Sequence, residues 1–123
     1  LVTSAAALTG SHSAALGNGS YNRTASISQQ VVVPQHIYVV QYYQFVESTE
    51  NCPGSNQLMV YINNQPYQHY SICQDDDIQN WKQIKIYLVP AFRGQSVEFR
   101  LEFTSGISSD SRLYVDDFSF VLP

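Results

Sequence analysis

The sequence has few charged residues. Asp, Glu, Lys and Arg make up 13% of its 123 residues, against roughly 25% in an ordinary soluble domain. The six Lys and Arg are scattered singly and the net charge is −4, so the chain has no basic patch of the kind that nucleic acid requires. We therefore expect no nucleic-acid partner.

Long apolar runs are also missing. No run approaches the roughly 18 residues that a membrane span needs. Residues 1–8 are too short for a signal peptide and lack its basic start. We expect a protein without a membrane span, whose leader has already been removed.

Catalytic motifs are absent as well. His12, His36 and His69 lie far apart, and no nucleophile or metal-hydrolase motif accompanies them. Glu98 and Glu102 share one face of an expected strand, but they are four positions apart, which is roughly 13 Å along the strand. Glycoside hydrolases hold their two carboxylates about 5–9.5 Å apart. We predict no catalytic residues and no enzymatic activity.

Short alternating runs between turn residues are present instead, and this pattern is typical of β-strands. The plainest run is Ser96–Thr104, where apolar and charged side chains alternate. The pattern predicts one all-β domain over residues 1–123, a two-sheet antiparallel β-sandwich (jelly roll) of about eight strands. The runs are residues 4–8, 13–16, 25–33, 36–46, 57–62, 66–73, 81–89, 96–104 and 112–122.

Two local features follow from the same pattern. Asn63 and Asn64 separate two of the runs and predict a tight hairpin turn. In the last run the apolar residues change from odd to even positions. A strand can change faces in this way only by inserting a residue, so we predict a β-bulge at Asp116 and Asp117.

The two cysteines, Cys52 and Cys73, flank the expected hairpin. As a disulfide they would add about 3 kcal/mol of stability in the chain-entropy model, and the alternative is a pair of buried free thiols. No His cluster accompanies them at metal-ligand spacing. Asn18 and Asn22 begin two N-glycosylation sequons in one polar stretch. With the cysteines and the low charge, these sequons favour a secreted, extracellular protein.

The side chains that point away from the core are rich in Tyr, Gln and Arg. Aromatic rings stack on the C–H faces of sugars, and planar polar groups bind sugar hydroxyls in pairs. The alternative is that Tyr is simply a good strand former. Strand order decides which side chains share a face, and the sequence leaves this open. The predicted ligand-binding residues are Gln41, Tyr43, Tyr61, Tyr87, Glu98 and Arg100.

Three further residue groups have simpler interpretations. Arg100 lies between Glu98 and Glu102 and is the expected ion-pair partner of these glutamates. Asp75–Asp77 is expected to be a solvated loop, because hard cations need ligands from spaced positions. Trp81 opens an expected strand and is interpreted as a packing anchor.

The order of these segments resembles the galactose-binding-like jelly rolls, and in particular the CenC-type (family 4/9) carbohydrate-binding modules. The resemblance covers nearly the whole chain, and its most specific part is the closing segment Tyr114–Phe118. The segments are "LTGSHSAALG" (8–17), "SISQQVVVP" (26–34), "IYVVQYY" (37–43), "WKQIKIYLVPAFRGQSVEFRLEF" (81–103) and "RLYVDDFSFVL" (112–122).

This resemblance implies a non-catalytic module that binds a glycan or cell-wall polysaccharide. It also implies a structural Ca²⁺ with Asp116 among the ligands. One departure is clear, because the family's opening strand near "N-G-x-F-E", which often supplies another calcium ligand, has no counterpart here. The same departure suggests an alternative role. A sheet edge left open by the missing strand would allow a structural or adhesive subunit to assemble with copies of itself.

Overall fold

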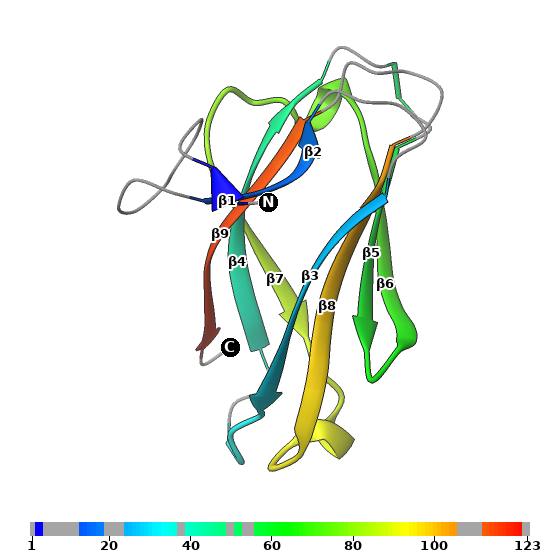
Figure 1. Cartoon of the computed structure of the whole chain (residues 1–123). Coiled ribbons are helices and arrows are strands. Elements are labelled where there is room, and N and C mark those ends of the chain that lie inside the picture. Colours follow the sequence, from blue (N-terminus) through cyan, green and yellow to red (C-terminus); the bar gives the residue numbers. More distant parts are fainter. Residues whose placement is uncertain are drawn as a thin grey trace.

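A computed structural model of the chain describes residues 2–3, 13–18, 24–36, 39–48, 51–52, 56–105 and 112–121. Nine strands occur in these residues, together with two 3₁₀ turns, η1 (Gln74–Asp76) and η2 (Pro90–Phe92). None of the described helices is long and apolar enough to cross a membrane. The strands are β1 (Val2–Thr3), β2 (Ser13–Asn18), β3 (Thr24–Val32), β4 (Val39–Glu47), β5 (Asn56–Ile62), β6 (Gln65–Ile72), β7 (Lys82–Tyr87), β8 (Ser96–Thr104) and β9 (Arg112–Val121) (Figure 1).

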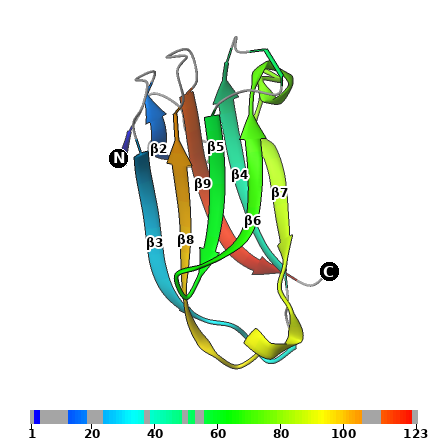
Figure 2. The same cartoon turned by 90° about the vertical axis from the view of Figure 1, so that its right-hand side faces the viewer.

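These strands form two antiparallel sheets that pack face to face, as Figures 1 and 2 show. Sheet A has the order β1-β2-β9-β4-β7, and sheet B has the order β3-β8-β5-β6. The predicted all-β, two-sheet sandwich is confirmed. β8 has the predicted bounds, and β7 is shorter than the predicted run 81–89. The predicted strand at residues 4–8 lies outside the described residues.

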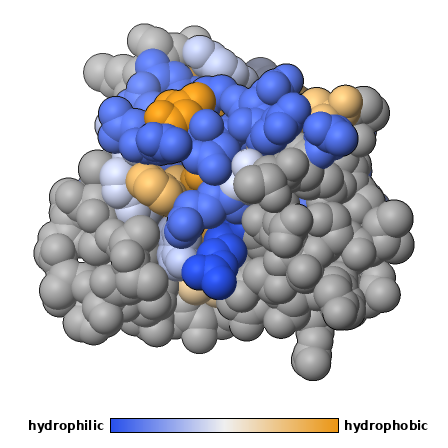
Figure 3. Space-filling view, turned by 90° about the horizontal axis from the view of Figure 1, so that it is seen from above, coloured by the Kyte–Doolittle hydropathy of each residue, from blue (hydrophilic) through white to orange (hydrophobic). Residues whose placement is uncertain are grey.

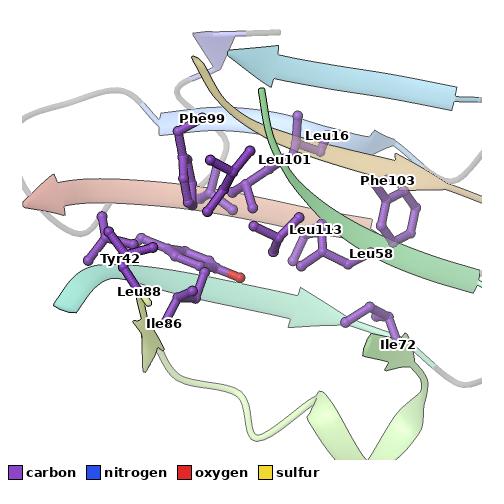
Figure 4. Packing of buried hydrophobic residues seen from close by; sticks show 14 of the residues in the cluster. Leu16, Tyr42, Leu58, Ile72, Ile86, Leu88, Phe99, Leu101, Phe103 and Leu113 are labelled. Atoms are coloured by element: carbon purple, nitrogen blue, oxygen red, sulfur yellow. The ribbon is translucent and has the colours of Figure 1, made fainter. Parts of the chain in front are cut away.

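The core lies between the sheets and follows the period-2 pattern of the sequence. On β8, Val97, Phe99, Leu101 and Phe103 are all buried, as their alternation predicts. Figure 4 shows side chains from both sheets pointing into the shared interior. Tyr42 is fully buried there. Its hydroxyl has no hydrogen-bond partner among the described residues. Burial raises the pKa of Tyr42 well above its usual value, and the neighbouring Tyr70 adds to this effect.

The hairpin turn is confirmed. Asn63 and Asn64 have φ angles of 52° and 63°, which suit the type I′ turn that joins two neighbouring antiparallel strands. The Asn63 side-chain oxygen accepts a hydrogen bond from the backbone N–H of Glu98 at 3.0 Å. The turn is therefore tied to the neighbouring strand β8.

The bulge in β9 is confirmed to within one residue. Gln41 pairs with Ser119 and Tyr43 with Asp116, so the single residue Tyr42 faces two residues of β9. One of these two is Asp117, with a φ of 55°; the other is Phe118, whose ring stacks on Tyr42 at 5.1 Å between centroids. Aspartate adopts positive φ more readily than most residues. The extra residue turns the end of β9 so that Phe118 and Phe120 pack on the core.

Cys52 and Cys73 form a disulfide with their Cα atoms 5.4 Å apart, so the alternative of free thiols is excluded.

The three aspartates Asp75–Asp77 do not form a simply solvated loop, which the sequence suggested. Asp76 accepts a hydrogen bond from the backbone N–H of Cys73, and Asp77 accepts one from Ser48, both at 3.0 Å. Two of the three carboxylates therefore accept hydrogen bonds from backbone N–H groups at the upper end of the sandwich. The described surface at that end is largely hydrophilic (Figure 3).

Candidate binding face

The six predicted ligand-binding residues lie on opposite outer faces of the sandwich, three on each. Strand order separates them, because β4 and β7 belong to sheet A while β5 and β8 belong to sheet B. The structure therefore does not bring the predicted set together as one site. The two groups are Gln41, Tyr43 and Tyr87 on sheet A, and Tyr61, Glu98 and Arg100 on sheet B.

A hydrogen-bonded cluster lies on the sheet A face where the edge strand β7 pairs with β4. The Gln83 amide nitrogen donates to the Gln41 side-chain oxygen at 2.9 Å and to the Tyr43 hydroxyl at 3.1 Å. Both amide protons of Gln83 are thereby used. Within the described part of the chain, the Gln83 oxygen, the Gln41 amide nitrogen and the Tyr43 hydroxyl proton have no protein partner. The cluster thus offers one acceptor and two kinds of donor side by side.

The register extends this cluster across three strands. Tyr43 pairs with Gln83 on one side and with Asp116 on the other, and Gln41 pairs with Lys85 and Ser119. Outward side chains of directly opposed residues lie about 4.5–5.5 Å apart at Cβ. Two neighbouring rows of polar side chains therefore cross β7, β4 and β9.

Aromatic rings flank these polar rows at both ends. Tyr87 pairs with Val39 at one end, and its side chain is 56% exposed. At the other end Phe45 makes edge contacts with Trp81 and Tyr114, at 5.6 and 6.3 Å between ring centroids. Trp81 does pack against another ring, but it does so on the outer face of sheet A. Trp81 is two positions before Gln83 in the alternating run, so its side chain also points outward and lies outside the core.

The corresponding face of sheet B is built differently. The Arg100 guanidinium lies 4.3 Å from the centre of the Tyr61 ring and forms an ion pair with Glu98 at 3.6 Å. The predicted pairing of Arg100 with a glutamate is confirmed for Glu98. One face of the Tyr61 ring is thus covered by a cation of the same chain. That face of the ring is not open to a ligand unless Arg100 moves.

The remaining predicted site residues are not assembled into a centre by the described part of the structure. Asp116 is half-buried, and its Oδ1 accepts the backbone N–H of Asp117 at 2.9 Å. Among the described residues no group of three acidic, His or Cys ligand atoms includes Asp116, whereas calcium takes six to eight oxygens. Calcium at Asp116 therefore stays a prediction. Glycosylation also stays a prediction, since Asn18 ends β2 and Asn22 lies outside the described residues.

We define the Tyr–Gln face as Gln41, Tyr43, Gln83, Lys85 and Tyr87. Gln83 has the central position on it, although it is not among the six predicted ligand-binding residues. The signal was its place in the run Trp81, Gln83, Lys85, Tyr87. Its partners could not be predicted, because they depend on the pairing of β7 with β4. Exposed rings beside unsatisfied amide and hydroxyl groups can bind a flat ligand that carries several hydroxyl groups.

Solved structures with a similar fold include carbohydrate-binding modules. TmCBM61, solved in complex with β-1,4-galactotriose, matches with a TM-score of 0.62 and 15% identity, over 99% of this chain and 81% of that one. Family 16 carbohydrate-binding module-2 matches with a TM-score of 0.56 and 19% identity, over 98% of this chain and 83% of that one.

A further match comes from a larger protein, the secreted serine protease VesC from Vibrio cholerae. The TM-score is 0.55 and the identity 12%, over 83% of this chain but only 19% of the protease. No family model and no curated protein matches the sequence. At these identities the likeness establishes a shared β-sandwich fold and no more.

Proposed function

We propose that this chain is a secreted, non-catalytic carbohydrate-binding domain, and that it recognises a glycan or cell-wall polysaccharide on the Tyr–Gln face. The observation that carries the proposal is the shared amide of Gln83. By donating to Gln41 and Tyr43 it orients three unsatisfied polar groups toward solvent, next to the exposed ring of Tyr87. Such an array can bond neighbouring sugar hydroxyls while the ring stacks on the sugar.

The fold and the disulfide support this proposal. Both modules among the similar structures are carbohydrate-binding proteins by name. The CenC-type modules that the sequence resembles have the same kind of role. The Cys52–Cys73 bond is of the sort that persists outside the cell. The protein should therefore be found in the culture medium of its source and contain no free thiol, and retention inside the cells with two free thiols would contradict secretion.

The test is binding of the full chain to a panel of neutral polysaccharides, measured by calorimetry and by affinity electrophoresis. The panel begins with β-1,4-galactan, since a galactotriose is bound in one similar structure, and continues with cellulose, xylan and mannan. Replacing Gln83→Ala removes the orienting donor, and we expect a loss in affinity of about tenfold, the value of one hydrogen bond to a sugar.

The matched control is Gln57→Ala, which removes an amide that points outward from β5 on sheet B. We expect Gln57→Ala to leave the affinity unchanged. Absence of binding to every polysaccharide would contradict the proposal. Binding that is lost in the Gln57 variant and kept in the Gln83 variant would place the site on sheet B.

A further inference from the structure

The edges of the two sheets are not equally protected. In the described part of the chain, β1 and β7 form the edges of sheet A, and β3 and β6 form the edges of sheet B. An edge strand presents unpaired backbone groups to which another chain can add. Natural proteins prevent this with short strands, charges, proline or bulges.

Three of these edges carry such protection. β1 has only two residues. β7 has Lys82 and Lys85 among its six residues. β6 contains Pro66, which cannot donate a backbone hydrogen bond, and its pairing with β5 is interrupted by a bulge between Val60 and Tyr61.

β3 has none of these protections. Its nine residues, TASISQQVV, include no charged residue and no proline. It pairs with β8 at every position from Thr24 to Val32 without a shift in register. Within the described residues it has no strand on its other side. β3 is therefore a long, regular and uncharged edge.

The inner side of β3 is incompletely covered. Ala25, Ile27 and Val31 point toward the core but stay half-exposed, and Gln29 is exposed at an inward position. Beside them the core opens into a cavity of about 290 Å³ whose far wall includes Phe118 and Phe120 of β9. Among the residues that the structure describes, no ionisable side chain lines this cavity.

The register of β9 explains the opening. β2 pairs with β9 only from Arg112 to Val115. From Asp116 to Val121 the described strands pair with β9 on the β4 side alone. Sheet A thus has no described strand beside residues 116–121 on the side away from β4, and apolar side chains from both sheets border the opening.

We propose that a second copy of this chain pairs with β3 through its own β3, in antiparallel orientation about a two-fold axis near Ser28. In that register Ser28 lies opposite Ser28 of the other copy, Ile27 lies opposite Gln29, and Ala25 lies opposite Val31. The two four-stranded sheets become one sheet of eight strands, and the half-exposed inward side chains of the two copies cover one another.

The absence of charge favours a second copy as the occupant. A two-fold axis brings like residues together, so any charged residue near Ser28 would meet its own copy. Residues 24–32 contain none. Each copy also supplies the same missing backbone partners that the other requires, over the same length of strand. The pairing is self-complementary in hydrogen bonds, charge and apolar contact.

The test is sedimentation equilibrium of the full chain between about 1 µM and 1 mM, a range that covers most weak protein pairings. We expect a monomer–dimer equilibrium. Replacing Ser28→Lys places two cations across the axis, and we expect it to weaken dimerisation by at least tenfold. His69→Lys is the matched control, because His69 is an exposed outward residue on the protected edge β6, and this variant should dimerise like the original protein.

A second variant tests the register. In Ser28→Cys the two new thiols lie directly opposite, about 4.5–5.5 Å apart at Cβ in such a pair. We expect it to form a covalent dimer on mild oxidation, whereas Gln68→Cys on β6 should not. Circular dichroism of each variant verifies that the fold is retained.

Three results would overturn the proposal. The first is a monomer at every concentration. The second is a dimer that Ser28→Lys leaves intact, which would place the interface elsewhere. The third is tight binding of the neutral apolar dye N-phenylnaphthylamine to a purely monomeric protein, which would identify the cavity beside β3 as a small-molecule site.

Discussion

The two outer faces of the sandwich contain similar residue types but differ in what remains open to a ligand. On sheet A, Tyr43 and its glutamine neighbours hydrogen-bond to each other in a way that leaves polar groups facing solvent. On sheet B, the Tyr61 ring lies beneath Arg100, and Arg100 is paired with Glu98. A tyrosine-rich composition therefore does not identify a binding face, because the neighbours of each ring decide its availability.

The largest expected effect comes from the core that both faces share. Phe103 is 1% exposed between the sheets, and Phe103→Ala should lower the free energy of unfolding by about 3–5 kcal/mol through lost burial and a cavity. Urea denaturation measures this change. Both faces should be lost together in one cooperative transition, and two separate transitions would contradict a single shared core.

The comparison is tested directly by removing one tyrosine from each face. Tyr43→Ala should weaken glycan binding by about 10- to 100-fold, because it removes a ring and a partner of Gln83. Tyr61→Ala should change the affinity by less than about twofold. Calorimetry with the best polysaccharide of the panel measures both. Equal losses would mean that the two faces do not differ in binding.

Tyr42 is buried in the core, so a change at this tyrosine should affect stability and leave the binding face unchanged. Tyr42→Phe removes a hydroxyl that has no partner among the described residues, so the free energy of unfolding should rise by about 1 kcal/mol. Glycan affinity should not change. A fall in stability would show that the hydroxyl has a partner, such as an ordered water molecule.

The same variant has a pH signature. The pKa of Tyr42 is raised in the folded state, so above pH 10 the unfolded chain loses this proton while the folded chain keeps it. Stability of the original protein should then fall as the pH rises above 10. The stability of the Tyr42→Phe variant should fall less steeply with pH. The slope that remains includes Tyr70, because burial also raises the pKa of this residue. Urea denaturation at several pH values measures the slopes.

The smallest effect is expected from uncovering the Tyr61 ring. Arg100→Ala removes a partly exposed ion pair and a cation–π contact, and should cost about 0.5–1 kcal/mol of stability. Glycan affinity should stay the same, because the polar array of sheet A is untouched. A new or stronger affinity in this variant would show that Arg100 alone keeps sheet B from binding.

Period-2 alternation predicted the inward side chains of β8, the change of face in β9 and the hairpin at Asn63 and Asn64. These features depend on neighbours in the sequence, so local pattern was sufficient. The disulfide required only that two cysteines flank a hairpin.

Strand order could not be predicted, because it depends on pairing between distant segments. For this reason the predicted ligand-binding residues include both Gln41 and Tyr61, which lie on opposite faces. The central position of Gln83 and the contact of Trp81 with Phe45 were missed for the same reason, whereas the outward phase of Trp81 follows from its odd position in the run. Binding by these residues, and any calcium at Asp116, stay predictions.

The bulge at Asp117 has a consequence for how this chain can change in length. Loops that connect strands can gain or lose residues while the side chains of the strands keep pointing to the same sides. Deletion of Asp117 would remove the extra residue and restore strict alternation, with Phe118 opposite Tyr42, Ser119 still outward, and Phe118 and Phe120 still on the core side. A relative that lacks one residue at this position should therefore keep the same core side chains, with a regular β9 in place of the bulge.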